Sequence, residues 1–227
     1  MELELAPEKK SIVYIGGYGQ GKTTVHNVAA AIETYHKGNV AGIDPYTFSC
    51  AIKNPSILRR AIEGAEVYTL SAGFMALVNA LEGKQDYLPG TIDAFNPPIP
   101  TSVPQLCGRT ALKSWDMLSD TDKPAARSYS RSSAAEFSVH VPTLVSALFD
   151  ISKFNAIKEA RDMQSRGVPV DLAYTDKDRY FMPTDEQKAF AKDAGVRILY
   201  LAGVHDEVAL RPEETFRLYM NAKASEI

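Results

Sequence analysis

Three residues of this 227-residue sequence have the side chains of a nucleophile, an acid and a base, and each follows a short apolar run. Ser71 follows EVYTL, Asp178 follows a run ending in LAYT, and His205 follows a run ending in LYL. A histidine that is oriented by a carboxylate can take the proton of a serine hydroxyl, which then attacks a carbonyl carbon. The three residue types therefore predict acyl-transfer chemistry.

The stretch TLSAG, which contains Ser71, has the composition of a tight strand-to-helix turn. Such a turn exposes the serine hydroxyl, and the amides of the following helix point at the same spot. The turn is crowded, and Ala72 and Gly73 are small enough for it. Thr69 stands where the pattern G-x-S-x-G has its first glycine. A serine that only caps the next helix is the alternative interpretation.

The acid and the base each have an alternative as well. Asp176 lies two residues before Asp178, and on an extended stretch both side chains would face the same way. A charged surface turn is the other interpretation of TDKDR. His205 differs from the other three histidines because it comes directly after an expected strand and a glycine bend. We expect the others to be surface or packing residues, and they are His26, His36 and His140.

A glycine-rich loop, IGGYGQGKTT, follows the first apolar run and allows two interpretations. Gly16 to Thr23 satisfies G-x-x-x-x-G-K-[ST], the phosphate-binding loop of nucleotide-hydrolysing proteins, in which Lys22 would contact phosphate. The same glycines would let the backbone approach a carbonyl oxygen and donate an amide to it. The choice depends on the rest of the chain, because the nucleotide interpretation gives Ser71, Asp178 and His205 no role.

Short apolar runs alternate with helical stretches along the chain, which predicts an α/β fold with a mostly parallel central sheet and helices on both faces. We expect strands at Ser11–Ile15, Val40–Ile43, Glu66–Leu70, Gly90–Phe95, Val168–Tyr174 and Val196–Leu201, and helices at Thr23–Tyr35, Ser56–Ile62, Phe74–Leu81 and Glu213–Ala222. Since ligands bind beyond the carboxyl ends of parallel strands, the three candidate residues are expected at one edge of the sheet.

In this order of serine, acid and histidine the sequence resembles the alpha/beta-hydrolase superfamily, whose members include serine esterases and lipases. The resemblance rests on IVYIGGYGQG, VAGIDPYTFS, VYTLSAGFMAL, VDLAYTDKDRYFMP and LAGVHDEVALRPEETF. It implies a Ser71–Asp178–His205 triad and an oxyanion hole made by the amides of Tyr18 and Ala72. Gly16 stands where this family usually has a histidine.

The resemblance implies a carboxylesterase-like enzyme that cleaves a small or medium ester through an acyl-enzyme. A phosphate-loop protein and an inactive hydrolase-like binding module are the alternatives. Gly17, Phe74 and Trp115 are expected to contact the substrate, although Phe74 could equally be ordinary core. No metal or other cofactor is expected.

We expect a single domain over residues 1–227, in which residues 101–153 are a helical lid with stretches near Ala125 and Leu144. The net charge of −3 and the lack of a basic block argue against nucleic acid as a partner. The start lacks a signal-peptide pattern and no apolar run reaches membrane-spanning length, so we expect a cytoplasmic protein. Cys50 and Cys107 are expected to be free thiols. The sequence leaves the oligomeric state open.

Overall fold

The computed structural model describes residues 11–18, 20–36, 38–44, 55–84, 86–106, 129, 131, 148–178 and 180–225. Within these residues the strands form one parallel six-stranded sheet in the order β2-β1-β3-β4-β5-β6. The strands are β1 (Ile12–Ile15), β2 (Val40–Ile43), β3 (Glu66–Leu70), β4 (Thr91–Phe95), β5 (Val170–Thr175) and β6 (Arg197–Leu201). Because every pair is parallel, all carboxyl ends meet at one edge of the sheet.

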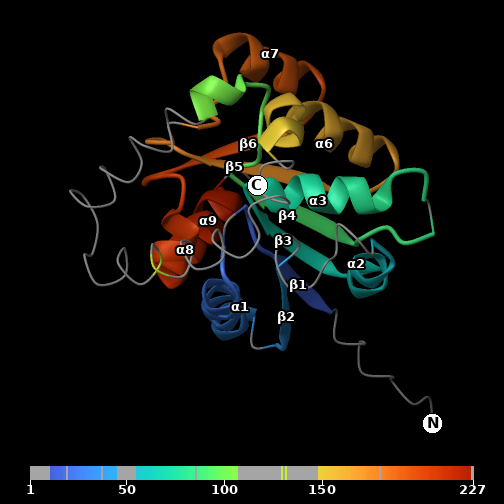
Figure 1. Cartoon of the computed structure of the whole chain (residues 1–227), viewed down its shortest axis with the longest axis vertical. Helices are drawn as coiled ribbons and strands as arrows, with labels where there is room; N and C mark the ends of the chain where they lie inside the picture. Colours follow the sequence, from blue (N-terminus) through green and yellow to red (C-terminus); the bar gives the residue numbers. More distant parts are fainter. Residues whose placement is uncertain are drawn as a thin grey trace.

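Helices cover both faces of the sheet, which makes three layers (Figure 1). One face packs against α1 (Lys22–His36), α8 (Glu207–Leu210) and α9 (Pro212–Ser225). The other face packs against α2 (Pro55–Ile62), α3 (Ala72–Leu81), α6 (Ala156–Ser165) and α7 (Asp185–Asp193). The predicted fold class is confirmed.

Alternation of side chains along the strands builds a separate core on each face. In β1, Ile12 and Tyr14 belong to the cluster under α1 and α9, whereas Val13 and Ile15 belong to the cluster under α2, α3 and α6. This two-residue period is the geometry of a strand that is covered on both sides. The apolar runs in the sequence reflect this double burial, so each predicted strand lies within two residues of its observed bounds.

An ionic cluster of largely buried carboxylates and partly exposed cations links α9 to the middle of the sheet. Asp93 of β4 and Asp171 of β5 are neighbours in register, and the Lys223 ammonium lies 2.8 Å from one carboxylate and 3.0 Å from the other. The Tyr219 hydroxyl donates to Asp93 at 2.6 Å, and Arg197 pairs with Asp171. Burial raises the pKa of Asp93 despite this lysine, whereas the hydrogen bonds from Arg197 and Lys223 outweigh burial and lower that of Asp171.

The expected lid falls mostly outside the described residues, so it stays a prediction. Its described parts are residues 101–106, 129, 131 and 148–153, with helical turns at 103–106 and 148–153. Tyr129 packs against Leu210 and donates its hydroxyl to Asp206 at 3.0 Å, which joins this segment to the turn after β6. Also outside the described residues are Trp115, the stretches near Ala125 and Leu144, and the thiols Cys50 and Cys107.

Candidate active site

Ser71 occupies a strained turn between β3 and α3. Its φ of 51° and ψ of −127° lie where non-glycine residues are rare and cost about 1–3 kcal/mol. Its side chain makes no capping hydrogen bond to α3, which argues against a serine that only caps the helix. A Cβ at Gly73 would lie 2.5 Å from the Ile15 carbonyl oxygen, so only glycine fits two residues after the serine. Thr69, which stands where the G-x-S-x-G pattern has its first glycine, is a fully buried residue of β3.

A chain of two hydrogen bonds joins the three candidate residues. His205 Nδ1 lies 2.8 Å from Asp178 Oδ2, and His205 Nε2 lies 3.0 Å from Ser71 Oγ. A carboxylate only accepts, so the proton of the neutral imidazole is assigned to Nδ1, and Nε2 accepts from the serine hydroxyl. The structure thus brings together, in bonding order, the residues that the sequence predicts.

The Asp178 side chain is fully buried, and backbone amides hold it in place. Asp178 Oδ1 accepts from the amides of Tyr180 at 2.6 Å and Phe181 at 3.3 Å, which leaves Oδ2 for His205. Asp176, the alternative acid, is exposed and accepts instead from the Gly203 amide at 2.9 Å. The expectation that both carboxylates face the same way is wrong, because residues 176–177 form a turn and are not extended.

The turn after β6 is shaped by Gly203 and closed by Glu207. Gly203 has a φ of +133°, and Glu207 accepts from the Val204 amide at 3.0 Å. Backbone bonds from Asp176 and Lys177 join this turn to the turn after β5. His205 is therefore fixed by a local bend and by the neighbouring loop together.

Aromatic rings enclose the His205 imidazole, whose side chain is only 9% exposed. The ring of Tyr180 lies 4.9 Å from it between centroids, and the ring of Phe181 lies 5.4 Å from it. The apolar rings and the burial of both side chains lower the local dielectric around the Asp178–His205 bond, which strengthens a hydrogen bond.

The glycine loop after β1 packs against the Ser71 turn. A Cβ at Gly17 would lie 2.8 Å from the Leu70 carbonyl oxygen and 3.1 Å from the Ser71 Cβ, so only glycine permits this approach. Tyr18 follows directly and is half-buried against the core. Ala72 is the first residue of α3, so its amide belongs to the positive end of that helix.

Several amides of this loop are engaged within the protein, which argues against a phosphate-binding loop. The Gly16 amide donates to Ile43 at 2.8 Å, the Gly17 amide to the Gln20 side chain at 2.9 Å, and the Gln20 amide to Gly17 at 3.2 Å. A phosphate loop needs its amides to face the phosphates. Lys22 is an exposed residue in the first turn of α1.

The burial of Phe74 argues against its expected role as a substrate contact. Its side chain has no exposed surface and meets Phe154 edge-on at 5.9 Å between ring centroids. The alternative interpretation of Phe74 as core is the better one, because the residue lies on the buried face of α3. Trp115 is among the residues that the structure does not describe.

Polar residues that the sequence analysis did not select also support the site. Gln20 is buried and accepts from the Tyr14 hydroxyl as well as from the Gly17 amide, both at 2.9 Å. Asn96 is fully buried and donates to the His205 carbonyl at 2.7 Å. Asn96 could have been suspected, because a polar residue directly after a buried strand lies at the carboxyl edge of the sheet. Nothing in the local sequence around Gln20 indicates that its side chain supports the site.

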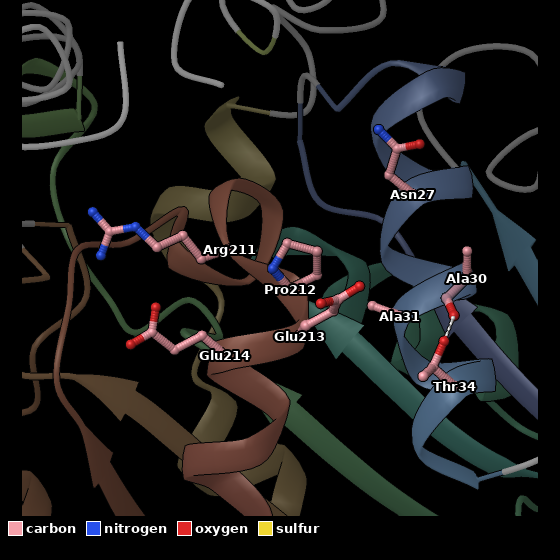
Figure 2. A pocket seen from close by; sticks show the side chains of 8 residues that line it. All are labelled: Asn27, Ala30, Ala31, Thr34, Arg211, Pro212, Glu213 and Glu214. Atoms are coloured by element: carbon pink, nitrogen blue, oxygen red, sulfur yellow. Dashed lines mark hydrogen bonds between the residues drawn. The ribbon is translucent and has the colours of Figure 1, made fainter. Parts of the chain in front are cut away.

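Two surface grooves lie away from these residues. The larger, of about 440 Å³, lies between α1 and the start of α9 (Figure 2). There the Thr34 hydroxyl turns back onto the Ala30 carbonyl at 3.1 Å, and Arg211 pairs with Glu207 at 3.0 Å. The second, of about 350 Å³, lies between α3 and α6. Neither is lined by a member of the Ser71–His205–Asp178 chain.

The described residues meet the requirements of neither a metal site nor a membrane-spanning helix. Among them, no group of three or more histidine, cysteine, aspartate or glutamate side chains could hold a metal ion. None of the described helices combines the length and the apolar character that crossing a membrane requires.

Comparison with known proteins supports the fold. No model of a protein family and no curated protein sequence matches this chain. Among solved structures, one from a study of carboxylesterases of Nitrososphaera gargenis has a TM-score of 0.65 to this chain at 14% sequence identity. The match covers 96% of this chain and 90% of that one. The enol-lactonase of Burkholderia xenovorans has a TM-score of 0.65 to this chain at 15% sequence identity, and the match covers 95% of this chain and 92% of that one.

A third match is the extracellular alpha/beta-hydrolase of a Paenibacillus species, with a TM-score of 0.58 at 14% identity over 94% of this chain and 99% of that one. The matches extend over nearly the whole of each chain, so the likeness concerns the entire sheet and its helices. This chain has the alpha/beta-hydrolase fold.

Proposed function

We propose that this protein is a serine hydrolase that cleaves a small or medium ester-type acyl substrate by two-step acyl transfer. The observation that carries the proposal is the hydrogen-bonded chain from Ser71 through His205 to Asp178. The strained backbone of Ser71 supports it, because strain of this kind is concentrated at functional sites.

In the first step His205 Nε2 takes the hydroxyl proton of Ser71 while Oγ attacks the carbonyl carbon. Asp178 holds the imidazole in the required tautomer and stabilises the imidazolium that forms. The proton then passes to the leaving alcohol, and an acyl-enzyme remains. In the second step His205 takes a proton from water while the water oxygen attacks the acyl carbon. The bond from that carbon to Ser71 Oγ then breaks, His205 returns the proton to Oγ, and the carboxylic acid leaves.

The negative charge on the substrate oxygen would be received by the backbone amides of Tyr18 and Ala72. The close approach of Gly17 to the Ser71 turn and the position of Ala72 at the start of α3 support this assignment. Loss of one oxyanion donor costs roughly 10²–10³ in rate. Besides these two amides, Gly17 remains a proposed substrate contact among the described residues.

The ester part of the proposal is supported by similarity to other proteins, because a serine, histidine and acid arrangement serves acyl transfer from esters and amides alike. The compared structures include a carboxylesterase study and an enol-lactonase, both of which concern acyl–oxygen bonds. A panel of p-nitrophenyl esters of increasing acyl length, followed by a thioester, an amide and a lactone, would define the bond and chain length that turn over fastest.

The test combines covalent labelling with two substitutions. A fluorophosphonate should label Ser71, located by mass spectrometry, and Ser71→Ala should abolish labelling and lower ester turnover by about 10⁶-fold. Lys22→Ala is the matched control, because an exposed ammonium has no use in this mechanism. Its turnover and melting temperature should stay near those of the wild type.

Two results would contradict the proposal in different ways. Nucleotide-dependent thermal stabilisation that disappears in Lys22→Ala would restore the phosphate-loop interpretation. Absence of labelling, of ester turnover and of nucleotide binding would favour an inactive binding module with a hydrolase-like fold.

A further inference from the structure

The carboxyl end of β4 is hydrogen-bonded to the turns that carry Ser71 and His205 and to the end of the strand that precedes Asp178. The Phe95 carbonyl accepts from the Ser71 amide at 2.7 Å. The next residue, Asn96, accepts with Oδ1 from the Thr175 amide at 2.7 Å and donates with Nδ2 to the His205 carbonyl at 2.7 Å. The serine, the end of the acid's strand and the histidine are therefore tied to two consecutive residues.

The orientation of the Asn96 amide is determined by its partners. The Thr175 amide can only donate, and the His205 carbonyl can only accept. Oδ1 must therefore face Thr175 and Nδ2 must face His205. The Thr175 hydroxyl also donates to Oδ1, at 3.2 Å.

Asn96 is also unusual in its burial and backbone. It has no exposed surface, and its φ of 46° lies in the left-handed region, which asparagine, aspartate and glycine tolerate better than other residues. Its own amide donates to Ala173 of β5 at 2.6 Å. The backbone conformation and the side-chain bonds together give a rigid bridge from β4 to β5 and to the histidine turn.

We propose that Asn96 is a positioning residue that sets the place of His205 relative to Ser71 and Asp178, an inference that rests on the proposed function. Through its carbonyl, His205 accepts a hydrogen bond from the buried Asn96 side chain, and this bond links the turn after Gly203 to the core. Without this bond a buried carbonyl loses its donor, and the imidazole can move away from the serine. A misplacement of about 1 Å costs up to roughly 100-fold in rate.

The test uses two variants of Asn96 and a matched control. Asn96→Asp suits the left-handed backbone and keeps an acceptor for Thr175, but a carboxylate repels the His205 carbonyl. Asn96→Gly keeps the backbone conformation and removes both bonds. Thr175→Val removes a hydroxyl that contacts the same Asn96 oxygen and leaves the bond to His205 intact.

Turnover of p-nitrophenyl butyrate is measured per active site, with sites counted by fluorophosphonate labelling to completion. Both Asn96 variants should lose kcat by about 10- to 100-fold with little change in KM, because the acyl site itself is intact. Thr175→Val should stay near the wild-type kcat. If Asn96→Gly does not fold, Asn96→Asp carries the test, because it retains the bond to Thr175.

A merely structural role would lower the melting temperature and the number of sites but leave kcat per labelled site unchanged, and that result would overturn the inference. An equal loss in Thr175→Val would also overturn it. Ser71→Ala is measured in parallel. If it is inactive and Asn96→Asp is fully active, only the role of Asn96 fails. If it retains wild-type hydrolysis, the proposed function fails and the role of Asn96 fails with it.

Discussion

Replacing Asp178 by asparagine should change the tautomer of His205 while leaving the fold intact. Asp178 Oδ1 accepts from two backbone amides, so the carbonyl oxygen of an asparagine must take that place. Its NH₂ group is then forced toward His205 Nδ1, where Oδ2 now lies at 2.8 Å. Because an NH₂ group donates, Nδ1 must be unprotonated to accept from it. The proton of the neutral imidazole then lies on Nε2, which faces the serine.

An imidazole with its proton on Nε2 cannot accept the hydroxyl proton of Ser71. The expected loss of kcat is about 10⁴-fold, which corresponds to about 5.4 kcal/mol of transition-state stabilisation. The melting temperature should change little, because both amide bonds to the side chain are retained. The assay is steady-state hydrolysis of p-nitrophenyl butyrate, with thermal unfolding measured on the same samples.

Asp176→Asn is the matched control in the same turn. Asp176 is exposed, and an asparagine oxygen can still accept from the Gly203 amide, so turnover should stay near that of the wild type. A mild Asp178→Asn together with a severe Asp176→Asn would refute the assignment of the acid. Equal, small losses in both variants would refute a carboxylate-oriented histidine altogether.

Three further predictions concern packing, charge and pH. Gly73→Ala should lower stability by about 1–3 kcal/mol and reduce turnover by displacing the glycine loop, whereas Asn79→Ala, on the exposed side of α3, should change neither. Lys223→Met should cost about 3 kcal/mol, or about 6–12 °C in melting temperature by calorimetry, because it leaves the Asp93 carboxylate buried without its cation. That loss should shrink below the raised pKa of Asp93, where the carboxyl is neutral, and a loss independent of pH would contradict this reasoning. If His205 is the base, it must be neutral to accept the Ser71 proton, so hydrolysis should be slower at acid pH than at neutral pH, and a rate that does not depend on pH would argue against this role.

The sequence predicts the sheet well because its strands are buried on both faces. Such strands appear as short apolar runs with turn residues at their ends, and β2 and β3 were predicted with their observed bounds. The expected helices do not include α6, α7 or α8. In α7 only Ala191 is buried, so its sequence shows little apolar periodicity. Its capping box, from Thr184 to Gln187, was the available signal.

The triad residues could be selected from the sequence because each follows a strand, and parallel strands bring such positions to one edge. The partners that hold them could not be selected in the same way. The choice between Asp176 and Asp178 depends on a turn of two residues, which local pattern does not resolve. The bond from Asn96 to His205 joins residues 109 positions apart, so it depends on the finished sheet and not on local sequence.

Lys223 is synthesised after every strand of the sheet, yet its ammonium lies between the carboxylates of Asp93 and Asp171. While the chain is still growing, Arg197 of β6 can neutralise Asp171, but Asp93 would have to enter the sheet beside it without its cation. Burying unpaired charge is costly, so the centre of the sheet should stay hydrated until α9 docks. Closure of the core on this face of the sheet therefore belongs to a late stage of folding. A nascent chain that lacks α9 should be open to proteolysis between β4 and β5, in the middle of the sheet and not at its edges.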